Sequence, residues 1–216
     1  MLTRYENKKT IRNSLKTLSG QIYSARTRIL YEIIQNADDC SFDDGVKPEL
    51  LFESSDDALI AWHNESGFQP KDLYALCQVG ESSKAAGSGK IGRKGIGFKS
   101  VFQICDCPII ISPPFSFCFD TITHGAFGFI VPSWVDNPRK RVPEQHRRLL
   151  DCEGAEAEEG SAAGTMLVCP VARRGQGLDL MRDLSFEGLS LAFLKHLEKI
   201  RFASSMGDQV IQTAVL

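Results

Sequence analysis

Three glycines within six residues constrain this chain more than any other feature of its sequence. They form G-x-x-G-x-G at Gly92, Gly95 and Gly97, inside a Gly-, Ser- and Lys-rich segment over residues 80–97. The next residues, FKSVFQIC, have helical periodicity. A glycine loop that enters a helix presents backbone N–H groups and the positive end of the helix dipole to an anion. The pattern therefore predicts a phosphate site, with a flexible surface loop as the alternative.

This loop and the sequence after it do not match three common nucleotide-binding patterns. It lacks the G-x-x-x-x-G-K-[ST] order of a Walker A loop. The Rossmann pattern has the reverse spacing, G-x-G-x-x-G, and directly follows a first strand. A protein kinase would need VAIK, HRD and DFG elements, and none follows the loop.

A second feature is a predicted amphipathic helix with a polar face rich in acidic and amide groups. Residues 6–40 are predicted to be helical, and Ser24 is a candidate N-cap for ARTRILYEIIQNADD. One side of this helix carries Leu30, Ile33, Ile34 and Ala37, and the opposite side carries Arg28, Glu32, Gln35, Asn36 and Asp39. A carboxylate one turn from a carboxamide can orient water beside a Mg²⁺-bound phosphate. The alternative is an ordinary solvated face.

The order of the remaining elements predicts the fold class. Strands are expected at ELLFES, ALIAWH, PIIIS, FSFCFD, AFGFIV and TMLVCPV, and helices at KDLYALCQV and LSLAFLKHLEKIRF. Strands grouped between helices predict an α+β domain, in which helices cover one face of a mixed, mainly antiparallel sheet as a two-layer α/β sandwich. We expect one domain over residues 1–216, with an irregular surface insertion over 133–164 that is basic first and acidic later.

Composition narrows the classes of partner. The formal net charge of −2 gives no general case for nucleic acid, and the basic run over residues 139–148 is expected to be a solvated loop. No apolar run is long enough for a transmembrane helix, and the charged N-terminus lacks a signal-peptide core, so we expect an intracellular protein, cytoplasmic or nuclear. Seven cysteines without a C-x-x-C pair predict free, mostly buried thiols and no cysteine metal site.

Five motifs together carry a family resemblance. ILYEIIQNADD, NESGF, VGESSK, IGRKGIGFKSVF and GTMLV stand in the order found in the GHKL (Bergerat-fold) ATPases, which include DNA gyrase, MutL, histidine kinases and the ninety-kilodalton heat-shock chaperone. Within that superfamily the chain resembles the branch of sacsin and the plant NO VEIN proteins. The resemblance covers residues 18–113 closely, and residues 164–170 extend it. It implies Mg²⁺ and ATP or ADP as ligands.

The resemblance also implies the principal catalytic and metal-binding roles. Glu32 would be the general base that activates water, and Asn36 would hold the Mg²⁺ that bridges the phosphates. Lys84 lies in the segment that corresponds to a mobile lid and would pair with a phosphate. The whole implied nucleotide-binding set is Asn36, Asp39, Cys40, Asn64, Gly67, Phe68, Lys84, Gly92, Gly95, Ile96, Gly97, Phe98 and Thr165.

Different members of this set would hold different parts of the nucleotide. Asp39 and Cys40 would line the nucleoside side, and residues 92–98 would contact the phosphates through their backbone. The Thr165 hydroxyl would help to hold adenine. The superfamily usually has Asp in D-x-G-x-G as the acceptor for the adenine amino group. Here either His63 or Asn64 takes that position, and Asn64 would supply a neutral amide oxygen, weakening the bond by ~1 kcal/mol.

Three functions remain open at this point. The first is a slow Mg-dependent ATPase, whose lid closure drives a conformational change in a chaperone-like or regulatory role. The second is a nucleotide-binding clamp without hydrolysis. The third is a histidine-type kinase, for which His196 on the last predicted helix is the phosphoacceptor candidate. The superfamily's architecture also implies an N-terminal piece of a longer protein, with a following domain or a second copy completing the site.

Overall fold

The sheet at the centre of the protein has eight strands. In the computed structural model, the described residues are 28–77, 97–150, 164–183, 194–204 and 210–215. The strand order is β5-β4-β3-β6-β2-β1-β7-β8. The strands are β1 Glu49–Ser54, β2 Ala58–His63, β3 Ile109–Ser112, β4 Phe115–Cys118, β5 Ser133–Trp134, β6 Thr165–Pro170, β7 Lys199–Ser204 and β8 Val210–Val215. Among the strands in the described ranges, only β1 and β7 pair in parallel, which confirms the predicted mixed, mainly antiparallel sheet of an α+β fold.

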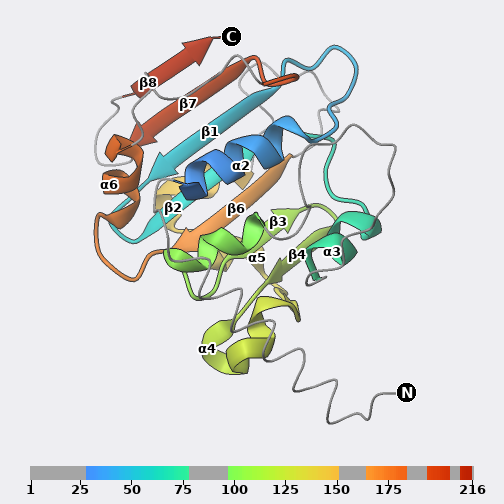
Figure 1. Ribbon diagram of the computed structural model, residues 1–216, viewed down its shortest axis with the longest axis vertical. Helices are drawn as coiled ribbons and strands as arrows, with labels where there is room; N and C mark the ends of the chain where they lie inside the picture. The colour runs from blue at the N-terminus through green and yellow to red at the C-terminus, as the bar shows by residue number, and fades with distance from the viewer. Residues whose placement is uncertain (1–27, 78–96, 151–163, 184–193, 205–209, 216) are drawn as a thin grey trace.

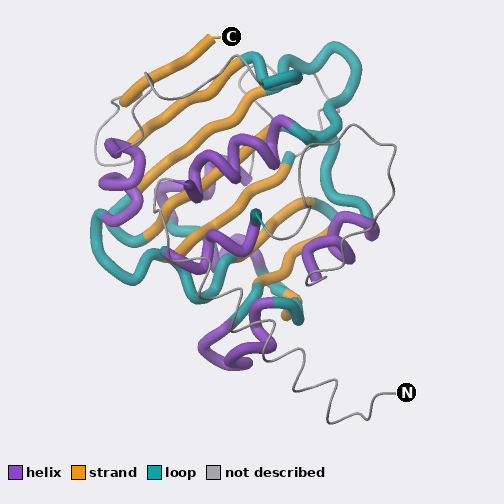
Figure 2. Tube along the Cα trace, in the orientation of Figure 1, coloured by secondary structure: helices purple, strands orange, loops and turns teal. Residues whose placement is uncertain are grey.

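Helices of two kinds accompany the sheet. The α-helices are α2 Arg28–Asp38, α3 Pro70–Cys77, α4 Thr121–His124, α5 Pro138–Arg141 and α6 Gln176–Asp183. The 3-10 helices are η1 Phe98–Gln103, η2 Gly125–Phe129 and η3 Glu144–Leu150. Helix α2 crosses one face of the sheet (Figures 1 and 2). Among the described residues, no helix combines the length and apolarity needed to span a membrane.

The larger part of the core lies between α2 and the sheet. The buried face of α2 consists of Ile29, Leu30, Ile34 and Ala37, close to the face that the sequence predicts. In β1, Leu50 and Phe52 point into this core while Leu51 points to the other face, as the period of two along a strand requires. Phe52 stacks on Phe202 of β7 with ring centroids 5.0 Å apart. The parallel β1–β7 pair therefore contributes to the core on the side of the sheet that α2 covers.

The second face of the sheet is also covered, by residues that the sequence assigned to a surface loop. Val135, Val142 and Leu149, all between β5 and the end of η3, are buried against it. The buried Glu53 carboxylate accepts two hydrogen bonds of 2.8 Å from the Arg148 guanidinium, which fastens this segment to β1. The acidic half of the expected insertion, residues 151–163, lies outside the described residues.

Residues 126–131 are not the strand that their composition predicts. The Asp120 side chain accepts a hydrogen bond of 2.9 Å from the Thr123 backbone and starts α4, and the chain continues into η2. Gly128 packs so tightly that an added Cβ would lie 2.0 Å from the Asp120 carbonyl oxygen. Local capping and this close backbone contact outweigh the β propensity of the aromatic residues.

The predicted last helix, LSLAFLKHLEKIRF, is wrong where the structure describes it. Residues 194–198 are not helical, and residues 199–204 form β7 beside β1 (Figure 1). The Asp38 carboxylate accepts the backbone N–H groups of Lys195, His196 and Leu197 at 2.8–3.0 Å. These donors therefore bind a side chain of α2 in place of the carbonyls of a helix. His196 is consequently not a helical residue, and the histidine-kinase alternative loses its phosphoacceptor candidate.

Candidate functional site

A cavity of about 250 Å³ opens beside the C-terminal part of α2. Its wall includes residues of α2, α3, η1, β2, β3 and β6 and of the loop after β2. Seven residues of the predicted nucleotide-binding set line it: Asn36, Asp39, Cys40, Gly67, Phe68, Phe98 and Thr165. Residues far apart in the sequence thus meet around one space. Lys84, Gly92, Gly95 and Ile96, most of the predicted lid, and residues 1–27 with Ser24 lie outside the described residues.

The end of α2 supplies the first wall of this cavity. Asn36 is exposed on the last turn, and Asp39 and Cys40 follow where the helix ends. The Cys40 thiol donates to the Asn36 carbonyl oxygen at 3.1 Å, which turns the sulfur back toward the helix. The amphipathic pattern that buries Ala37 in the core therefore also turns these three residues toward the cavity.

The Glu32 carboxylate lies against the backbone of Gly97, where η1 begins. A Cβ added at Gly97 would lie 2.2 Å from Glu32 Oε2, so this approach requires glycine. Gly97 has φ −59° and ψ −45°, which any residue adopts, so close contact is the constraint here. Glu32 itself does not line the cavity, and its Oε1 lies 3.4 Å from Nε of Arg28. The two motifs that the sequence singled out are direct neighbours in space.

Hydroxyl groups hold the loop after β2 against the sheet. The buried Thr165 hydroxyl donates to Ser112 Oγ at 2.6 Å, and the backbone N–H of Phe68 donates to the same oxygen at 2.8 Å. Gly67 has φ +84°, a conformation that favours glycine and that turns the chain toward Phe68. The conformation of this loop is therefore fixed by β3 and β6, with Thr165 at the cavity.

His63, and not Asn64, lines the cavity. The Asn64 amide oxygen accepts from the Glu49 backbone at 2.8 Å, and its nitrogen donates to the Lys47 carbonyl at 2.9 Å. Both ends of the Asn64 amide are thus occupied by the backbone at the start of β1 and just before it. His63 ends β2, opposite Thr165 in the β2–β6 register, and it reaches the cavity.

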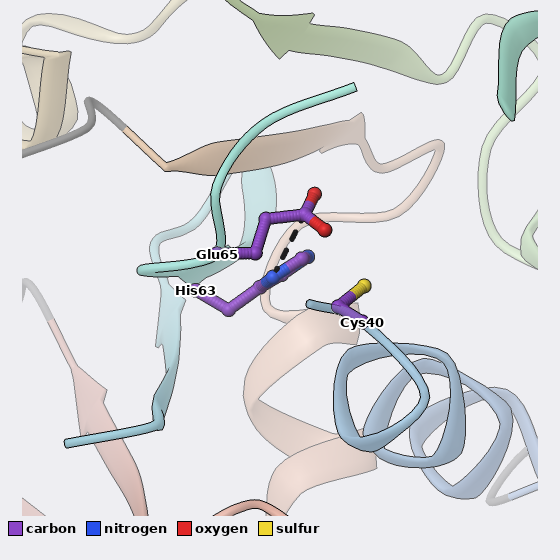
Figure 3. A group of neighbouring side chains, drawn as sticks. All are labelled: Cys40, His63 and Glu65. Carbon is purple, nitrogen blue, oxygen red and sulfur yellow. Dashed lines mark ion pairs between the residues drawn. The ribbon is translucent and has the colours of Figure 1, made fainter. Parts of the chain in front are cut away.

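Glu65 also lines the cavity, and the sequence reasoning missed it. Its side chain is only 6% exposed, and its Oε1 lies 3.9 Å from His63 Nδ1. Burial lowers the pKa of the His63 imidazole, against the opposing effect of the Glu65 charge. A signal for Glu65 was present, because Glu65-Ser66-Gly67 has the spacing of the D-x-G pattern. Cys40, His63 and Glu65 approach one another from two sides of the cavity (Figure 3).

A buried lysine lies next to the cavity residue Phe98. The Lys99 amino group lies 4.0 Å from the ring centroid of Phe119 and 5.3 Å from that of Phe98. Burial lowers the pKa of this amine to about 7, partly opposed by the thiol of Cys77. The aromatic faces stabilise its charged form. Of the six cysteines in the described part of the chain, none forms a disulfide, as the sequence predicts.

The regions of this chain that match known proteins contain the structural elements described above. The family model described as "Sacsin domain" matches residues 48–178, from just before β1 into α6. The chain belongs to the sacsin-domain family. It is 43% identical over 122 residues to Protein NO VEIN of Arabidopsis thaliana. That alignment covers 56% of this chain and 4% of Protein NO VEIN. It is 34% identical over 117 residues to human Sacsin, in an alignment that covers 47% of this chain and 3% of Sacsin.

Both relatives are far longer than this chain. The matched segment spans 4% of Protein NO VEIN and 3% of human Sacsin. Helix α2 and the cavity residues 39–41 precede the matched residues 48–178, which contain the rest of the cavity lining. Roles for Glu32 and Asn36 therefore depend on their geometry and on the motif resemblance.

Proposed function

We propose that this sacsin domain binds Mg-ATP or Mg-ADP as a GHKL-type module and hydrolyses ATP slowly. The observation that carries the proposal is the convergence of the predicted motifs. Seven predicted contact residues line one cavity, and the Glu32 carboxylate lies against Gly97 beside it. These residues come from α2, from the loop after β2, from η1 and from β6, so no local sequence pattern forces them together.

The base of the nucleotide would occupy the buried end of the cavity. The Glu65 carboxylate has a buried oxygen, Oε1, without a hydrogen-bond partner among the described residues. A carboxylate there can accept a hydrogen bond from an exocyclic amine, as the family's Asp is expected to do. Ile33, Phe68 and Ile110 supply apolar walls for the ring. Thr165 lies at the same end and adds a hydroxyl.

The phosphates would lie between the end of α2 and the start of η1. Asn36 is exposed at the cavity, and a single amide oxygen there fits Mg²⁺, which keeps several waters and takes phosphate oxygens for its other ligands. When bound, Mg²⁺ would neutralise phosphate charge. The Glu32 side chain is 22% exposed and can therefore contact water. Its carboxylate can orient that water by accepting a hydrogen bond and can then take up its proton as a general base. Closure of the lid that the resemblance implies over residues 80–94 would complete the site.

A nucleotide clamp without hydrolysis is the second candidate. It is favoured by the position of Glu32, whose carboxylate lies outside the cavity lining and beside the guanidinium of Arg28. In this case the nucleotide would only stabilise the closed state and so regulate contacts with a following domain or a second copy.

Nucleotide titration with matched variants tests the proposal. A fluorescent ATP analogue titrated with Mg²⁺ should bind wild type and fail to bind Asn36→Ala. Gln35→Ala is the control, because Gln35 is exposed on the same helix and does not line the cavity. Absence of binding to folded wild type refutes nucleotide binding. If Glu32→Ala keeps binding and loses phosphate release, the protein is an ATPase; if wild type binds and releases no phosphate, the clamp is correct.

A further inference from the structure

Three side chains with metal-binding chemistry meet at the closed end of the cavity. Cys40 follows α2, His63 ends β2, and Glu65 lies in the loop after β2. A thiol sulfur, an imidazole nitrogen and a carboxylate oxygen, one from each residue, all lie within 4.8 Å of one another. In Figure 3 the three side chains approach a common space. The spacing of the cysteines along the chain gave no indication of this cluster.

The hydrogen bonding of the cluster is incomplete. His63 Nδ1 and Glu65 Oε1 are both buried and have no hydrogen-bond partner among the residues that the structure describes. Their separation of 3.9 Å is too long for a hydrogen bond between them. An unpaired buried donor or acceptor costs about 1–3 kcal/mol, and more when it is charged. A cation between these atoms would satisfy both.

The donor set selects a borderline metal ion. Zn²⁺ binds thiolate, imidazole and carboxylate, whereas Mg²⁺ and Ca²⁺ prefer oxygen ligands. With metal–ligand lengths of roughly 2.0–2.3 Å, tetrahedral ligand atoms lie about 3.5 Å apart. The observed limit of 4.8 Å therefore requires a contraction of about 1.3 Å, which rotation of the half-buried Cys40 side chain would supply by giving up its hydrogen bond to the Asn36 carbonyl oxygen.

We propose that Cys40, His63 and Glu65 form a three-ligand site for Zn²⁺, and that Zn²⁺ and the nucleotide exclude each other. The fourth position of a tetrahedral ion would face the cavity, which all three residues line. Exclusion follows because the Glu65 oxygen that would bind the base would instead bind the ion. The exclusion rests on the proposed nucleotide function, whereas the metal site does not.

Cobalt substitution tests the metal site directly. The 216-residue chain, stripped with a chelator, should take up one Co²⁺ and show a thiolate-to-cobalt charge-transfer band. Cys40→Ser should abolish the band, and Cys77→Ser should keep it, because Cys77 is a half-buried thiol outside the cluster. Glu65→Gln and His63→Gln should each weaken Zn²⁺ binding roughly tenfold or more, since even outer-shell changes cost about 10–100-fold. Circular dichroism checks that each variant is folded.

The outcomes separate the two proposals. A Co²⁺ spectrum without a thiolate band, or equal loss in Cys77→Ser, overturns the metal site. If Zn²⁺ binds and no nucleotide binds even to the metal-free protein, the metal site stands and the proposed function fails. If both bind, the apparent Kd for the nucleotide should rise in proportion to the Zn²⁺ concentration, once that concentration exceeds the Kd for Zn²⁺. A nucleotide Kd that is independent of Zn²⁺ overturns the exclusion.

Discussion

The Asp38 carboxylate joins the end of α2 to the segment that leads into β7, and its removal should be costly. Its oxygens accept backbone N–H groups from Lys195, His196 and Leu197 at 2.8–3.0 Å, and the residue is only 4% exposed. Burial, the largest single effect, raises the pKa of this carboxyl. The three backbone hydrogen bonds and the nearby His196 outweigh it and hold the pKa below its usual value. The carboxylate is therefore stabilised as the anion.

The size of the loss follows from the three donors. A hydrogen bond to a charged acceptor contributes about 1.5–3 kcal/mol. Lys195 and His196 are exposed, so water can replace part of their bonds after truncation, whereas Leu197 is buried and its N–H would stay unpaired. Asp38→Ala should thus lower the free energy of unfolding by about 3–5 kcal/mol. Asp38→Asn keeps Oδ1 for His196 and Leu197 and should cost about 1–2 kcal/mol.

Urea unfolding monitored by circular dichroism measures both losses. Because the folded pKa of Asp38 is lowered, its contribution is complete at pH values above the ordinary carboxyl pKa of about 4. It disappears as the pH falls through the folded pKa, so the difference between wild type and Asp38→Asn should shrink in acid. A loss below about 1 kcal/mol for Asp38→Ala, or equal losses for the two variants, would refute this reasoning.

Three further predictions address the other contacts. Gly97→Ala should change the free energy of unfolding by less than about 1 kcal/mol but lower phosphate release at least about tenfold, because its Cβ displaces the Glu32 carboxylate; calorimetry and a phosphate assay check both. Gly164→Ala should cost about 2–4 kcal/mol in thermal unfolding, because its Cβ would lie 2.4 Å from a backbone carbonyl oxygen, whereas Gly45→Ala, also at positive φ but in open space, should cost about 1 kcal/mol. Burial raises the pKa of Glu53, yet its contacts with His146 and with the Arg148 guanidinium lower it overall, so the stability lost in Glu53→Gln should be greatest at neutral pH and shrink in acid.

Much of the fold was predictable because local patterns and tertiary packing agree. The apolar face of α2, the strands at ELLFES and ALIAWH, and the helix expected at KDLYALCQV each appear where the sequence indicates. Residues 199–204 differ because their apolar spacing also suits a strand, and pairing with β1 decides between the two. The short strand β5, the edge strand β8 and helix α6 were not predicted. Strand β5 has only two residues, too few for a period to be recognised, and β8 pairs with β7, which the sequence was expected to place in a helix.

The candidate site was predictable where glycine and polar spacing carry information. The proximity of Glu32 and Gly97 follows from two motifs that the sequence marks clearly. The cluster of Cys40 with His63 and Glu65 could not be predicted, since it depends on where the end of α2 lies against the end of β2. The competing roles of His63 and Asn64 could be separated only by hydrogen bonds from the chain before β1.

The last residue of α2 and the two residues after it contact two different parts of the protein. Asp38 carries the backbone of residues 195–197, while the next two residues line the cavity. A ligand that rotates this turn should also change the hydrogen bonds between Asp38 and the segment that leads into β7, because Asp38 directly precedes the cavity residues in the chain. Occupancy of the cavity and hydrogen-exchange protection in residues 195–204 should therefore change together, so that β7, which lies on the far side of β1 from the cavity strands β2 and β6, reports on the site.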